Sequence, residues 1–142
     1  MAPLQKRAWY SLAIGLVFAI ALIVVFITKG GIGTFKEDSG FRIIISVLWI
    51  GGLVTSLILT NFTLRKPGQV DERDKLIMRR APVVQLWAVI FSLVAWMIVL
   101  TESYWDEGQI PVIFPYLILL STLIVSTIAQ SAGILIGYWR MR

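Results

Sequence analysis

Long apolar runs separated by short charged connections dominate the chain. Four runs, residues 8–28, 43–62, 83–101 and 112–139, contain no Asp, Glu, Lys, Arg or His, and each has at least 19 residues. An α-helix rises about 1.5 Å per residue, so about 20 residues cross a hydrocarbon layer of about 30 Å. Because a backbone in lipid must satisfy its own hydrogen bonds, each run is expected to be helical. The pattern predicts an all-α membrane protein, an antiparallel four-helix transmembrane bundle that forms one integral-membrane domain over residues 1–142.

Within each run, small and polar residues recur at helical spacing on one face. Lipid gives apolar side chains little reason to prefer helix contacts, so helices associate through close backbone approach and interhelical hydrogen bonds. We therefore expect these faces to meet, with Gly133 and Gly137 at a helix contact. The four faces comprise Ala8, Ser11, Gly15 and Ala19; Gly52, Ser56 and Thr60; Ala81, Gln85, Ala88, Ser92 and Ala95; and Thr122, Ser126, Ala129, Gln130, Gly133 and Gly137.

Four polar residues of the last two runs are the candidates for a pocket or for polar packing. Gln85 and Gln130 are the amides inside these runs, and Thr122 and Ser126 share a face with Gln130. Interhelical hydrogen bonding is the interpretation we favour for them. The alternative is a polar pocket that opens toward the cytoplasm.

Basic residues are distributed unequally between the two sides that four crossings would create. Short loops rich in Lys and Arg stay in the cytoplasm, so the distribution predicts cytoplasmic N- and C-termini. Ten basic residues share the side of the termini, and three lie on the other. The ten are Lys6, Arg7, Arg65, Lys66, Arg73, Lys75, Arg79, Arg80, Arg140 and Arg142; the three are Lys29, Lys36 and Arg42.

The connection between the second and third runs predicts a short cytoplasmic helix. Pro67-Gly68 is typical of a turn, and Asp71 has the character of an N-cap residue. The helix would lead into the third run through Pro82 and place Asp74 at the mouth of the bundle. We expect Asp74 to form a structural ion pair. Its candidate partners are Arg7, Arg65 and Arg140. A solvated, charged helix is the alternative.

The same element carries a resemblance. Asp71-Glu72-Arg73-Asp74, with Ile77 and Ala81 before an apolar run, resembles an uncharacterised family of small prokaryotic four-span membrane proteins. The resemblance covers about eleven residues together with the hydropathy plan. It implies a plasma-membrane location in a prokaryotic cell and brings no activity, substrate or catalytic residue with it.

Composition narrows the chemistry. The chain is 58% hydrophobic, and it contains no Cys and no His. Disulfides, thiolate nucleophiles, and zinc or haem sites built on Cys or His are therefore disfavoured, and we predict no cofactor. The net charge of +5 does not indicate nucleic acid, because the basic residues flank apolar runs. The expected partner is the lipid bilayer.

The sequence bears on three classes of function. A monomeric ion-coupled transporter is disfavoured, because such proteins usually keep an ionisable group inside the membrane. An enzyme is disfavoured too, and the acidic loop residues Glu102, Asp106 and Glu107 are read as solvated. The favoured class is a non-catalytic subunit that self-associates or binds a membrane or cytoplasmic protein. The alternative is an oligomeric small-molecule transporter or pore lined by Thr122, Ser126 and Gln130.

Overall fold

The computed structural model of the chain is all-α, as the apolar pattern predicts. It describes residues 3–31, 33–35, 37–64 and 71–141. Four long helices and one short 3₁₀ helix make up this part: α1 (Pro3–Thr28), η1 (Gly33–Phe35), α2 (Ser39–Leu64), α3 (Glu72–Tyr104) and α4 (Ile113–Arg140).

Each predicted span falls within one helix, apart from Val112, which directly precedes α4. Three helices, α1, α3 and α4, are long and apolar enough to cross a membrane. Over the side chains that the structure describes, α2 contributes the shorter apolar stretch Ser39–Thr55. The chain is an integral membrane protein by the length and composition of these helices.

The short helix expected before the third span is the first part of α3 itself. Asp71 is the N-cap, and its carboxylate accepts a hydrogen bond of 2.8 Å from the backbone N–H of Glu72. The Asp71 cap agrees with the sequence prediction, and the acidic residues Glu72 and Asp74 of the first turn suit the positive end of the helix dipole. Pro82 lies inside the helix, which continues through it to Tyr104.

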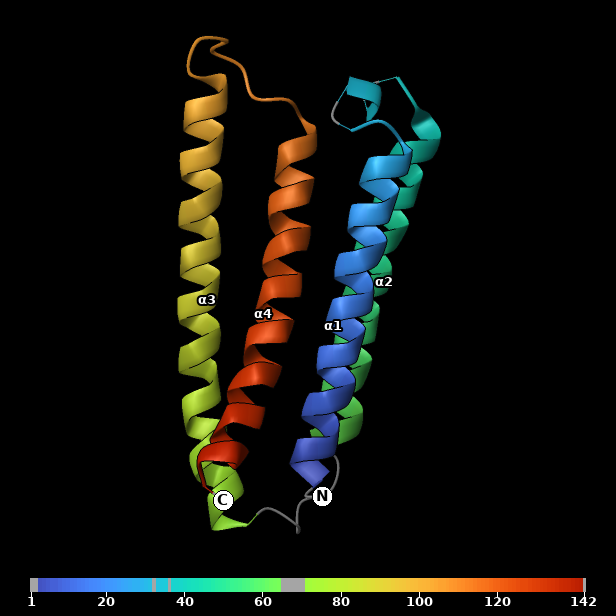
Figure 1. The fold of residues 1–142 in the computed structure, drawn as a ribbon. Helices are drawn as coiled ribbons and strands as arrows, with labels where there is room; N and C mark the ends of the chain where they lie inside the picture. Colours follow the sequence, from blue (N-terminus) through green and yellow to red (C-terminus); the bar gives the residue numbers. More distant parts are fainter. Residues whose placement is uncertain (1–2, 32, 36, 65–70, 142) are drawn as a thin grey trace.

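The helices follow the order α3, α4, α1, α2 across the molecule (Figure 1). The fourth helix packs extensively on α3 and on α1, whereas α2 packs mainly on α1 and η1. We call the end at which α1 and α3 begin and α4 finishes the terminal end. The opposite end, with the α1–α2 and α3–α4 connections, is the loop end. In this order α4 and α1 are the inner helices, and α4 is the one that packs extensively on both sides.

Apolar side chains close the bundle at both ends. The loop-end cluster joins all four helices and includes Trp96 and Tyr104, whose rings meet Phe114 edge-on. The terminal-end cluster joins α1, α3 and α4. The buried members are Phe41, Ile45, Leu100, Ile113, Phe114 and Leu117 at the loop end, and Ala8, Ile77, Ala81 and Ile134 at the terminal end.

Small residues lie where α4 meets its neighbours. A β-carbon placed at Gly137 would lie 3.0 Å from the Ile77 side chain, and one at Gly133 would lie 3.5 Å from the Cα of Ala81. Both positions face α3. On the other side, a β-carbon at Gly15 of α1 would come within 2.9 Å of Ile128. Such separations bring the helix backbones close together, which is the basis of helix association in lipid.

Candidate functional site

Two of the candidate polar residues meet between α3 and α4. The Gln85 Nε2 group donates a hydrogen bond of 2.6 Å to the hydroxyl oxygen of Ser126. Both side chains are half-buried. Their positions follow from the small-residue faces of the two helices, because these faces point toward each other. This contact is interhelical polar packing.

The other two candidates are placed differently. Gln130 lies one turn along α4 from Ser126, yet its side chain is exposed and lines a cavity. The hydroxyl oxygen of Thr122 is buried and has no hydrogen-bond partner among the described residues. The four candidates therefore do not form one continuous polar surface.

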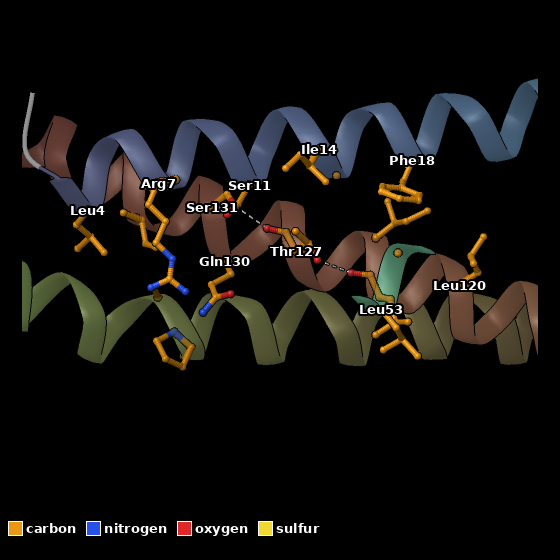
Figure 2. Close-up of a pocket in the computed structure, with 18 of the residues that line it drawn as sticks. Leu4, Arg7, Ser11, Ile14, Phe18, Leu53, Leu120, Thr127, Gln130 and Ser131 are labelled. Carbon is orange, nitrogen blue, oxygen red and sulfur yellow. Dashed lines mark hydrogen bonds between the residues drawn. The ribbon is translucent and has the colours of Figure 1, made fainter. Parts of the chain in front are cut away.

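A cavity of about 230 Å³ lies between the helices. It is bounded by α1, α2 and α4 and, at the terminal end, by the first part of α3 (Figure 2). Its walls run along α1 from Leu4 to Phe18 and are mostly apolar. The volume exceeds the roughly 150 Å³ of an engineered apolar cavity that binds benzene, and is below the roughly 300–1,000 Å³ typical of drug-sized pockets. The cavity can hold a small or slender apolar group.

Polar groups gather at the terminal end of the cavity. Figure 2 shows the Arg7 guanidinium and the Gln130 side chain pointing into the same space, toward α3. Ser11 and Ser131 line the cavity nearby. The Ser131 hydroxyl donates to the carbonyl oxygen of Thr127, at 2.8 Å. The arrangement presents donors beside an apolar space.

No acidic side chain neutralises Arg7 in the part of the chain that the structure describes. All eight Asp and Glu residues are in that part, and the ion pair formed there joins Lys29 to Asp38. Arg7 is half-buried. A partly desolvated charge without a counter-charge is unfavourable, so this guanidinium is a candidate for binding an anion.

Two tryptophans of the interior differ in their partners. The Trp96 indole N–H donates to the Ser121 hydroxyl, at 2.8 Å. Trp49 lines the cavity, and its buried indole nitrogen has no partner among the described residues.

Asp74 is buried, with 5% of its surface exposed. The Tyr138 hydroxyl donates a hydrogen bond to its carboxylate. Among the described residues, neither Arg7 nor Arg140 pairs with Asp74: Arg7 faces the cavity, and Arg140 is exposed at the end of α4. Tyr138 is the partner of Asp74 among the described residues. Arg65 lies outside the described residues, so its pairing with Asp74 stays a prediction.

The loop end carries the ion pair. Lys29 Nζ lies 3.3 Å from a carboxylate oxygen of Asp38, and the other oxygen accepts a hydrogen bond of 2.8 Å from the Gly40 N–H. The hydrogen bond from Lys29, followed by that from Gly40, holds the pKa of the Asp38 carboxyl below its ordinary value. This pair ties the end of α1 to the start of α2.

The described residues contain no group of three or more His, Cys, Asp or Glu side chains that could hold a metal ion. Comparisons with family models, curated proteins and solved structures found no match to this chain. The cavity with Arg7 at its terminal end is therefore the candidate site. From the sequence, Arg7 is expected to be one of the basic residues on the cytoplasmic side and a candidate ion-pair partner of Asp74. Its helical phase, one turn before Ser11 on the small-residue face, is the signal that could have placed it inward.

Proposed function

We propose that the chain is a non-catalytic subunit of a prokaryotic plasma membrane, which acts by self-association or by binding a partner protein. Four crossings with both termini in the cytoplasm are part of this proposal. Charge-free spans around a packed central helix suit a protein whose role is binding.

The hydrogen bond between Gln85 and Ser126 carries the proposal. A transport path needs polar groups that are free to contact water or a solute. Here a polar residue that was a candidate for a pore lining is engaged in the contact between α3 and α4. The Trp96–Ser121 bond makes a second polar link between the same helices. Polar side chains used in this way support a structural role for the bundle.

The positions of the basic residues support the orientation. Lys6 and Arg7 near the start of α1, Arg73 near the start of α3 and Arg140 at the end of α4 all lie at the terminal end. The loop end carries acidic residues, including Glu102 and Asp106. This asymmetry is the one that the positive-inside rule associates with a cytoplasmic face.

The alternative, an oligomeric pore, draws its support from Gln130, which is exposed to the cavity. Within one chain, however, Gln130 faces the cavity, whereas Ser126 lies in the contact between α3 and α4. A pore lined by both would need the α3–α4 contact to open. We therefore favour the binding role.

The test is reconstitution of the full chain in phospholipid vesicles. Subunit counting by single-molecule photobleaching, together with identification of co-purifying proteins from the native membrane, measures assembly. Release of trapped small solutes measures transport. We expect an assembly with itself or with a partner, and no release above that of protein-free vesicles. Solute release that Gln130→Leu abolishes, and that the control Gln109→Leu leaves intact, would establish the pore instead.

A further inference from the structure

The cavity has two chemically distinct parts. Arg7 and Phe18 are eleven residues apart on α1, so the lined length is about 16 Å along the helix axis. The Phe18 end is apolar and includes Leu48 and Leu120. The terminal end presents the Arg7 guanidinium and Gln130. A ligand that fits both parts has a slender apolar body and one polar head.

The charge of the head follows from Arg7. Its guanidinium has no carboxylate partner among the described residues, and it is half-buried beside apolar side chains. A guanidinium presents its N–H groups in a planar fork that matches a carboxylate or a phosphate. An anionic head would supply the missing counter-charge, and the Gln130 amide could donate a further hydrogen bond to it.

The volume limits the apolar body. A cavity of about 230 Å³ distributed along this length is narrow. It suits one unbranched chain better than a fused ring system. We propose that the cavity binds a single-chain anionic amphiphile, with the acyl chain between α1, α2 and α4 and the head on Arg7.

This assignment goes beyond the proposed function, and it does not depend on whether the chain self-associates. The shared chemistry of the ligand is one acyl chain with an anionic head. Two sources supply it: a free fatty acid, through its carboxylate, and a lysophospholipid, through its phosphate. Both partition into a membrane leaflet, so the experiment compares them directly.

The probe is dodecanoate carrying a diazirine near the far end of its chain, added to the full-length protein in phosphatidylcholine vesicles. Photolabelled residues are then mapped by mass spectrometry. We expect labels on the segments that contain Phe18 and Trp49, which line the apolar part of the cavity. Labels confined to Trp87 and Phe91, which are exposed on the outer surface of α3, would overturn the proposal.

Competition tests the need for charge on the unchanged chain. Dodecanoate should displace the probe at about tenfold lower concentration than dodecanol, because the free energy of a hydrogen bond to a charged group corresponds to a difference in affinity of about that size. Equal competition by dodecanol would overturn the proposal. Lysophosphatidylglycerol forms the second arm, and the better of the two anionic competitors identifies the source.

Two variants and one matched control locate the site. Arg7→Gln should lower cavity labelling about tenfold. Lys6→Gln removes the same charge from an exposed neighbour and should leave labelling unchanged. Ser11→Leu should block labelling by filling the cavity while retaining the helical circular dichroism signal. Equal losses in Arg7→Gln and Lys6→Gln, or full labelling in a folded Ser11→Leu protein, would contradict a site at this place.

Discussion

The Gln85 amide donates a hydrogen bond to the Ser126 hydroxyl, 2.6 Å away, across the contact between α3 and α4. Both side chains are half-buried, and the bond joins the two helices at this level. Interhelical bonds of this kind contribute about 0.6–2 kcal/mol.

Gln85→Leu is therefore expected to lower the free energy of unfolding by about 0.6–2 kcal/mol. Ser126→Ala should cost a similar amount, and the double variant should cost less than the sum, because both changes remove the same bond. The free energy of unfolding of all four proteins is measured in mixed micelles, with circular dichroism as the signal, and the four values form a double-mutant cycle. Strict additivity of the two single changes would show that the side chains do not interact.

A second prediction concerns Gly137. Because a β-carbon there would already lie 3.0 Å from Ile77, Gly137→Leu should overpack the α3–α4 contact and destabilise the fold by about 1–3 kcal/mol. Gly51→Leu is the matched control, since nothing lies within 4 Å of a β-carbon at Gly51. The two free energies of unfolding are compared under the same conditions. Equal losses in both variants would argue against close packing at Gly137.

Asp74 and Tyr138 give a third prediction. Tyr138→Phe removes the donor and leaves the buried carboxylate without a partner among the described residues, which is expected to cost about 1–3 kcal/mol. Asp74→Asn should cost less, because its amide oxygen can still accept from Tyr138 and no charge is buried. The thermal midpoints of the two variants provide the comparison. A greater loss in Asp74→Asn than in Tyr138→Phe would mean that Asp74 depends on another partner.

The Lys29–Asp38 pair predicts a local dependence on pH. The folded-state pKa of Asp38 lies below its unfolded value, so the pair stabilises the loop end above the unfolded pKa of about 3.9. That contribution is lost as the pH falls through the folded pKa. The protection factor of the Gly40 amide against hydrogen exchange, measured relative to the intrinsic rate at each pH, should fall over this acidic range, because its acceptor becomes protonated. Lys29→Met should move the transition to higher pH. An unchanged midpoint in that variant would show that Lys29 does not act on Asp38.

The sequence alone predicted the helices and several of their ends for clear physical reasons. A run of residues that is long enough to cross a membrane and contains no charged side chain predicts a helix, whatever its tertiary contacts are. The Asp71 cap is equally local, because an N-cap and an acidic first turn depend on adjacent residues. Pro82 was harder to interpret, since a proline in the first turn of a span and a proline inside a longer helix have the same sequence pattern.

The order of the helices could not be predicted in this way. Each small-residue face indicates that a helix has a close neighbour, but it does not say which neighbour. Gln85 and Gln130 look equivalent in sequence, yet one bonds Ser126 between α3 and α4 and the other faces the cavity. From its charge, Arg7 is expected on the cytoplasmic side or beside Asp74, and only its helical phase, one turn before Ser11, indicates the inward position that the structure shows.

The packing of α4 on α3 through their small residues is the central claim, and disulfide formation tests it directly. The chain has no native cysteine, so Ile77→Cys together with Gly137→Cys introduces a single pair of thiols. A β-carbon at Gly137 would lie 3.5 Å from the β-carbon of Ile77, within the range of about 3.5–4.5 Å that disulfides require. Mild oxidation in vesicles should give a disulfide within one chain, and the pair Gly51→Cys with Gly137→Cys should not. A double variant at 77 and 137 that stays reduced, or that forms only covalent dimers, would contradict the packing described.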